Sequence, residues 1–235
     1  MLSTTWTPAA LWSERFRWRE RAWRMVEAQH IASTMKLVDD AAEQDLLEQL
    51  LDGHKPAMPP AAAPLHYLLA APFRYPPLPG GSRFRAGTDP GVFYAAQDVA
   101  TAAAELGWWR WRFLQDAPDL QRLEPVAHTA FAVDLDTLAV DLRQPPLDRD
   151  AAAWTARDDY SATQALGRVA REAGLGALVY TSVRAPQPAW CVAVLQPAAF
   201  AQPRPDPATQ TWWLAVQPDG VLWRREAQAL RLAMP

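Results

Sequence analysis

Two arginines, a tyrosine and a glutamate lie between residues 83 and 105, in an order that suits chemistry on an anionic substrate. Arg83 and Arg85 lie in a segment rich in glycine and proline, Tyr94 ends a short apolar run, and Glu105 follows three alanines. A guanidinium stays protonated at any working pH and binds phosphate oxygens in pairs. A carboxylate nearby can stabilise a positive charge that develops during a reaction. The sequence therefore predicts a pocket for a phosphate-bearing ligand.

Each of these residues also has a structural interpretation. Loop arginines are often solvated or paired with acids, Glu105 could form an ion pair with an arginine, and Tyr94 could be a core aromatic residue. Alternate residues of an extended segment share a face, so either Arg83 or Arg85 could face the ligand. Ser182 ends an apolar run, where sites of α/β proteins often open, but turn serines are equally common there. Local sequence leaves these alternatives open.

The elements that position these residues follow from proline, glycine and apolar spacing. Residues 9–52 contain no proline or glycine and predict helix, with Trp12, Phe16 and Trp23 at helical spacing and a break near Ser33-Thr34 or Asp39-Asp40. Residues 56–64 are rich in proline and alanine and predict an extended connector. A body of mixed strands and helices begins near residue 65. The predicted fold class is α/β, of the α+β kind, with a mixed β-sheet core and an N-terminal helical extension.

Within the body, Asp98 is the predicted N-cap of a helix that runs past Glu105. A second helix should open at Asp158 or Ser161 and run to Glu172, where glycines follow. Strands are expected over 92–96, 128–135, 177–182 and 190–196, a terminal hairpin over 211–225, a short helix or strand over 66–71, and loops over 72–85 and 141–150.

Composition excludes several classes of protein and site. The net charge of −3 gives no electrostatic case for binding nucleic acid. Cys191 is the only cysteine and the four histidines are widely separated, so neither a disulfide nor a metal site is expected. Phosphate-loop, dinucleotide-fold and Gly-x-Ser-x-Gly motifs are absent. No secretory signal or membrane-spanning run is visible, so we expect a cytoplasmic protein that does not bind membranes.

Several segments, taken in order, resemble the RES domain family, which is named for its arginine, glutamate and serine. The resemblance spans about 65 to 200, and the front resembles the N-terminal extension of one subgroup. The matching segments are Arg83 with the glycine loop, Tyr94, Ala104-Glu105, Tyr180 to Arg184, Pro72 to Tyr75, Trp108 to Phe113, 26–30, 33–39 and Glu43-Gln44.

The resemblance implies a fold related to ADP-ribosyltransferases and NAD as the substrate, with no metal. Glu105, Arg83, Tyr94 and Ser182 match the family's catalytic positions. Arg74 and Tyr75 match a pair that lines the same pocket, while Arg85 competes with Arg83 for the pyrophosphate. Glu105 would then stabilise the cationic ribose as nicotinamide leaves.

The resemblance also implies a domain organisation, a biological role and a partner. The N-terminal helical extension would cover residues 1–55, the connector 56–64 and the catalytic domain 65–235. The chain would be a bacterial toxin that depletes NAD by hydrolysis or phosphorolysis. The alternatives are an ADP-ribosyltransferase acting on a specific protein and a non-catalytic interaction module. The implied partner is an antitoxin with an Xre-like helix-turn-helix domain that blocks the pocket, and a homodimer or larger complex with it is compatible with the family.

Overall fold

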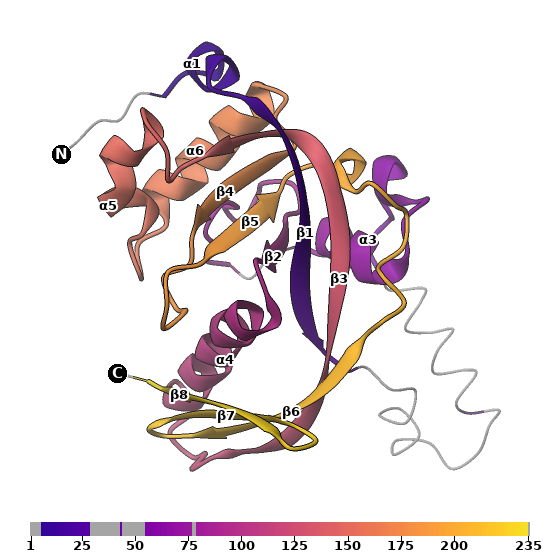
Figure 1. Ribbon diagram of the computed structural model, residues 1–235, viewed down its shortest axis with the longest axis vertical. Coiled ribbons are helices and arrows are strands. Elements are labelled where there is room, and N and C mark those ends of the chain that lie inside the picture. Colours follow the sequence, from indigo (N-terminus) through magenta and orange to yellow (C-terminus); the bar gives the residue numbers. More distant parts are fainter. Residues whose placement is uncertain (1–5, 29–42, 44–54, 77–78, 235) are drawn as a thin grey trace.

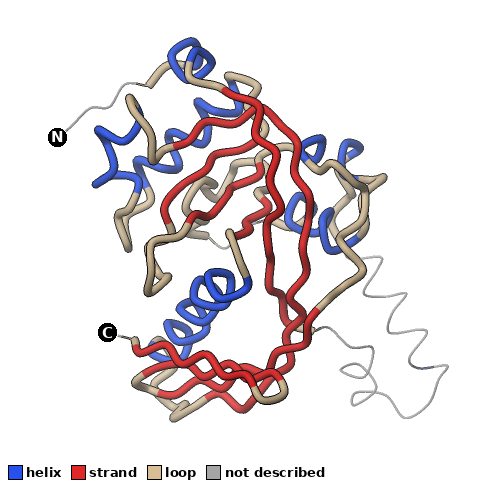
Figure 2. Tube along the Cα trace, viewed as in Figure 1, coloured by secondary structure: helices blue, strands red, loops and turns tan. Residues whose placement is uncertain are grey.

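The structure is a computed structural model that describes residues 6–28, 43, 55–76 and 79–234 of the 235-residue chain. One mixed sheet runs through it, with the strand order β1-β2-β5-β4-β3-β6-β7-β8 (Figures 1 and 2). The strands are β1 (Phe16–Glu27), β2 (Phe93–Ala96), β3 (Leu123–Asp141), β4 (Ala177–Thr181), β5 (Trp190–Val194), β6 (Gln210–Gln217), β7 (Gly220–Arg225) and β8 (Gln228–Ala233). The predicted α/β fold class with a mixed sheet is therefore confirmed.

The helices lie around this sheet. The α-helices are α1 (Pro8–Ser13), α3 (Tyr67–Arg74), α4 (Val99–Gln115), α5 (Ala151–Trp154) and α6 (Ser161–Glu172), and the 3-10 helices are η2 (Pro60–Ala62), η3 (Leu147–Asp150) and η4 (Pro197–Ala199). No helix in the described ranges is long and apolar enough to cross a bilayer. The helix predicted to run from Asp158 or Ser161 to Glu172 is confirmed, and of the helix or strand left open at 66–71 the structure forms a helix. The short helix η2 interrupts the connector expected over 56–64.

The prediction of a helix over 16–27 is wrong, because these residues form β1. Arg17, Arg19 and Arg21 alternate along the strand, and their side chains form ion pairs with Asp134 or Asp136 of β3. Trp18 and Ala22 point the other way and are buried in the core. Pairing with a neighbouring strand overrides a local preference for helix, which is a weak one. The remainder of the predicted helix, at 29–42 and 44–54, lies outside the described residues, and the domain boundaries at 55 and 64 stay predictions.

Strand β3 pairs with three other strands of the sheet. It pairs antiparallel with β1 from Phe16–Ala139 to Glu27–His128, antiparallel with β6, and parallel with β4 at Ala139–Asp141. Strand β1 also pairs with β2 at Trp23 and Ala96. The pairings therefore join β1, β2, β5, β4 and β3 into a closed circuit, and the antiparallel strands β6 to β8 extend from β3 beside it.

Helix α4 lies between this circuit and the β6–β8 extension (Figure 1). Its N-terminus is capped as predicted, since the Asp98 carboxylate accepts from the Thr101 amide at 2.8 Å. The Trp223 indole of β7 donates to the Ala103 carbonyl at 3.1 Å, and Ala102, Ala103 and Ala104 are buried. The alanine face thus allows close packing on the sheet, which fixes the position of the helix that carries Glu105.

Candidate active site

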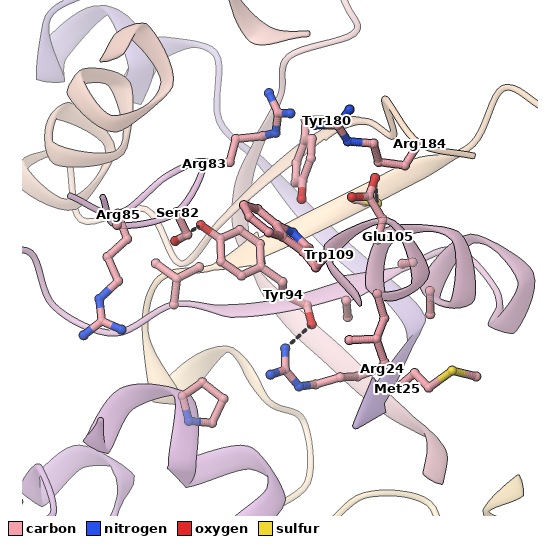
Figure 3. Close-up of a pocket in the computed structure, with 18 of the residues that line it drawn as sticks. Arg24, Met25, Ser82, Arg83, Arg85, Tyr94, Glu105, Trp109, Tyr180 and Arg184 are labelled. Carbon is pink, nitrogen blue, oxygen red and sulfur yellow. Dashed lines mark hydrogen bonds between the residues drawn. The ribbon is translucent and has the colours of Figure 1, made fainter. Parts of the chain in front are cut away.

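A single cavity of about 480 Å³ collects most of the predicted site residues. Its volume is typical of a small-molecule site. It opens between the start of α6, the middle of α4, the end of β1 and the loop before β2 (Figure 3). Of the predicted residues, its lining includes Tyr75, Arg83, Arg85, Tyr94 and Glu105.

Glu105 receives hydrogen bonds rather than an ion pair. Its Oε1 accepts from the Ser182 hydroxyl at 2.6 Å and lies 3.8 Å from the Cys191 Sγ. No arginine among the described residues forms a salt bridge with it. The structural ion pair considered for Glu105 from the sequence is therefore not present in the described part of the chain. Its carboxylate is held in place by two uncharged donors and keeps its negative charge free for another partner.

Ser182 follows β4 directly and is buried. Its Oγ also accepts from the backbone amides of Ala185 at 3.1 Å and Arg184 at 3.4 Å. It is thus both a strand-end turn serine and a contact of Glu105. Ser182 does not belong to the pocket lining, and acts on the pocket through the carboxylate that it holds.

The segment around the two arginines, residues 80–91, is here called the arginine loop. Ser82 and Arg85 exchange backbone hydrogen bonds of 2.7 and 3.1 Å, so residues 82–85 form a tight turn. The extended conformation assumed from the sequence is therefore wrong, because the turn replaces it. Gly81 makes this turn possible: its φ is +71°, and a Cβ there would lie 2.1 Å from the Arg85 carbonyl oxygen. Both arginines consequently line the pocket.

The two arginines have different partners. Arg83 is buried and its Nη1 donates to the carbonyls of Trp154 and Ala156 at 3.0 and 2.9 Å, while its guanidinium lies over the Tyr160 ring. Arg85 donates to the carbonyls of Asp89 and Tyr75 at 3.1 and 2.9 Å. Burial lowers the pKa of Arg85 from its ordinary value. Carbonyl partners leave the positive charge of both side chains unneutralised.

Tyr94 anchors the arginine loop through its hydroxyl. The oxygen accepts from the Phe84 amide at 2.9 Å and lies 2.8 Å from the Ser82 Oγ. Burial raises the pKa of this phenol above its ordinary value, so it remains protonated at neutral pH. Because the hydroxyl is engaged with the loop, the ring is the part of Tyr94 left to line the pocket.

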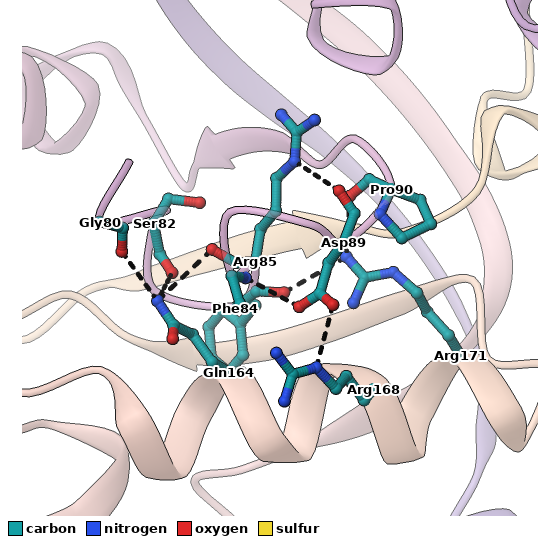
Figure 4. A network of polar contacts seen from close by, with 10 residues as sticks. Gly80, Ser82, Phe84, Arg85, Asp89, Pro90, Gln164, Arg168 and Arg171 are labelled. Atoms are coloured by element: carbon teal, nitrogen blue, oxygen red, sulfur yellow. Dashed lines mark hydrogen bonds and ion pairs between the residues drawn. The ribbon is translucent and has the colours of Figure 1, made fainter. Parts of the chain in front are cut away.

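Helix α6 holds the arginine loop from the other side (Figure 4). Gln164 donates to the carbonyls of Gly80 and Ser82, both at 3.1 Å. Arg168 forms an ion pair with Asp89 at 2.9 Å, and Arg171 donates to the carbonyls of Phe84 and Pro90. The helix approaches so closely that a Cβ on Gly167 would lie 2.5 Å from the Phe84 oxygen. Helix α6 thus holds the backbone of the loop through side chains that do not line the pocket.

Arg74 lies apart from the pocket. Its Nε donates to the carbonyl of Pro56 at 2.6 Å, and the residue is absent from the lining. The adjacent Tyr75 does line the pocket and is exposed. The structure therefore brings Tyr75 to the site and directs Arg74 toward the segment before η2.

Sequence reasoning missed several lining residues, including two further arginines. Arg184 stacks on the Trp108 ring at 3.4 Å and donates to the Arg157 carbonyl. Arg24, on β1, donates to the Tyr94 carbonyl. Arg184 lies two residues after Ser182, a spacing that could have indicated it, whereas Arg24 sits in a segment expected to be helical. The other missed lining residues that carry aromatic, hydroxyl or thiol groups are Trp23, Ser82, Trp109, Tyr160, Tyr180 and Cys191.

The charges of the described lining residues are unbalanced. Four arginines face one carboxylate, that of Glu105. Burial, with the negative charge of Glu105 adding to it, raises the pKa of the Cys191 thiol well above its ordinary value. The cysteine is therefore an uncharged thiol at neutral pH. In the part of the chain that the structure describes, no three His, Cys, Asp or Glu side chains form a group able to hold a metal. The arrangement suits an anion that carries a reactive centre toward Glu105.

A family model and solved structures both match the chain. A family model described as the RES domain matches residues 57–217. No curated protein sequence matches the chain. Among solved structures, the crystal structure of the M. tuberculosis MbcT-MbcA toxin-antitoxin complex aligns over 93% of this chain and 87% of that chain, with 13% sequence identity and a TM-score of 0.47.

Proposed function

Because the chain belongs to the RES domain family, we propose that it is the toxin of a bacterial toxin–antitoxin system and an enzyme that cleaves NAD between nicotinamide and ribose. The observation that carries this proposal is the position of Glu105. It is the single carboxylate among the described lining residues, held by Ser182 and surrounded by four arginines. The arginines of such a site can bind the two phosphates of a dinucleotide, and its one carboxylate can stabilise a cationic transition state.

In the proposed reaction, Arg83 and Arg85 bind the pyrophosphate and the Tyr94 ring contacts the nicotinamide or its ribose. The bond from the ribose anomeric carbon to the nicotinamide nitrogen breaks, and nicotinamide leaves as a neutral molecule with the bonding electron pair. Glu105 accepts a hydrogen bond from the ribose 2′-hydroxyl and stabilises the positive charge left on the sugar. Oxygen of water or phosphate then bonds to the anomeric carbon, and water in that step releases a proton.

The pocket also suggests how such a toxin is restrained. We propose an antitoxin with an Xre-like helix-turn-helix domain whose C-terminal segment covers the pocket. The excess of arginine over carboxylate supports a segment that is acidic or ends in its own carboxylate. The proposed place of action is the bacterial cytoplasm, where NAD is available.

Incubation of the purified chain with NAD tests the proposal. We expect nicotinamide to be released, together with ADP-ribose in phosphate-free buffer or phosphorylated ADP-ribose when phosphate is the acceptor. Chromatography of the products, with and without phosphate, identifies the acceptor. Label from NAD that remains on a lysate protein would instead indicate ADP-ribosyl transfer. Folded protein that releases no nicotinamide at millimolar NAD would contradict the proposal.

Ser182→Ala is expected to slow nicotinamide release about tenfold, the size of one hydrogen bond to a charged group. The reason is that Ser182 donates to the Glu105 Oε1 at 2.6 Å and so fixes the carboxylate. Steady-state kinetics of nicotinamide release measure the effect, which should fall on kcat. Ser13→Ala, at an exposed serine of α1 that bonds only nearby groups, is the control. An unchanged kcat in Ser182→Ala would show that Ser182 does not orient the Glu105 carboxylate for the reaction.

A further inference from the structure

Arg24 is a half-buried cation with incomplete partners. Its Nη1 donates to the Tyr94 carbonyl at 2.7 Å, and its guanidinium lies 4.8 Å from the centre of the Phe93 ring. Its Nε is buried and has no hydrogen-bond partner. Among the described residues, no carboxylate forms a salt bridge with it. Burial lowers its pKa to about 10, which still leaves the side chain protonated at neutral pH.

The position of Arg24 follows from the way β1 meets β2. The two strands pair only at Trp23 and Ala96, so the carbonyl of Tyr94 has no strand partner on that side. The Arg24 side chain spans this gap and reaches the pocket lining. In Figure 3 its guanidinium lies on the far side of Tyr94 from Arg83. The arginine loop and β1 therefore present cations to the cavity from two directions.

A partly buried charge without a carboxylate, with its Nε fully buried, is unfavourable for folding. Removing a guanidinium from water carries a desolvation penalty, and an unpaired buried N–H adds to it. An apolar residue at position 24 would avoid both penalties and could still pack on the Phe93 ring. An arginine here is accounted for when an anion in the cavity completes its hydrogen bonds.

We propose that Arg24 binds the phosphate oxygens of the ligand from the β1 side of the pocket. This inference rests on the proposed function for the identity of the ligand as a dinucleotide. Arg24 lies outside the region matched by the family model, 57–217, and none of the site residues implied by the family resemblance lies on β1. The first strand of the chain thus supplies a binding group of its own, in addition to pairing with β3.

The competing explanation is that Arg24 only supports Tyr94 through its carbonyl. Two variants separate the explanations. Arg24→Met removes both the charge and the bond to the Tyr94 carbonyl. Arg24→Gln removes the charge but retains an N–H donor for that carbonyl. Direct binding predicts the same loss of pyrophosphate affinity for both variants. A supporting role predicts that only Arg24→Met loses affinity.

The test is calorimetric titration of the full chain with inorganic pyrophosphate. We expect the dissociation constant to rise about 10- to 100-fold in both variants, as for loss of a charged hydrogen-bonding group. Arg19→Met, at an exposed arginine of the same strand, should bind as the wild type does. Wild-type affinity in folded Arg24→Gln would overturn the proposal, and so would a wild-type chain that does not bind pyrophosphate. Should Arg24→Met not fold, Arg24→Gln decides alone.

This design keeps the two proposals apart. Pyrophosphate binding reports on Arg24 whether or not NAD is cleaved, and nicotinamide release by the wild type reports on the proposed function. An intact wild-type activity with no effect of Arg24→Gln on pyrophosphate affinity rejects only the role of Arg24.

Discussion

Glu105→Gln is expected to reduce the rate of nicotinamide release about 10²- to 10³-fold, the usual effect of losing one stabilising group at a developing charge. The substitution keeps the side-chain oxygen that accepts from Ser182 and Cys191, so the local hydrogen bonds survive. What disappears is the negative charge. In a lining otherwise supplied with four arginines, no other described carboxylate can replace it.

The matched control is Glu172→Gln, at an exposed glutamate that ends α6. Circular dichroism and thermal unfolding should be alike for both variants and the wild type. In bacteria, Glu105→Gln should also remove the growth arrest that NAD depletion by the free toxin would cause. A folded Glu105→Gln protein that releases nicotinamide at the wild-type rate would exclude the carboxylate from the reaction.

Phe84→Ala is expected to lower the free energy of unfolding by about 3–5 kcal/mol, the range for removing a fully buried phenylalanine. Phe84 is completely buried between Arg83 and Arg85, and its ring packs edge-on against Tyr180 at 4.9 Å. Its backbone amide donates to the Tyr94 hydroxyl and its carbonyl accepts from Arg171, two bonds that hold the arginine loop. Loss of the ring therefore releases both flanking arginines, and the KM for NAD should rise together with the loss of stability.

Denaturant titration measures this free energy, and Phe113→Ala is the control. Phe113 is also a phenylalanine, but its side chain is 54% exposed on α4. Its removal should change the unfolding free energy by less than about 0.5 kcal/mol. If the two variants are equally stable, the ring of Phe84 does not anchor the loop.

The fold from residue 65 onward could largely be predicted from the sequence, whereas the N-terminal strand β1 could not. Asp98 indicated the start of α4 because its side chain caps the helix through a local hydrogen bond. The terminal hairpin was predicted correctly for the same reason, since its turn residues act locally, although β8 beyond it was missed. The structure of β1 depends on its pairing with β3, whose partner residues, Ala139 to His128, lie more than a hundred positions away. Local spacing carries no information about such partners.

The site also contains residues that local sequence could indicate and residues that it could not. Glu105 stood out because a carboxylate beside three buried alanines is unusual, and the pocket lining includes it. Arg24 did not stand out, since an arginine between Trp23 and Met25 fits a helix as well as a strand. The orientation of Arg74 was also beyond local sequence, because its partner is the backbone carbonyl of Pro56. The roles assigned to the predicted residues stay predictions until the kinetic tests are made.

The closed circuit of strands has a consequence for the order in which the protein forms on the ribosome. Arg24 cannot be fixed until β3 has emerged and paired with β1, and β2, which carries Tyr94, needs β5 at its edge. Contacts this distant in sequence form late in folding. The nascent chain therefore has no complete pocket until about residue 194 has been made. Only a chain that extends past this point can bind a ligand in the pocket, and only such a chain can be recognised by the antitoxin proposed to cover it.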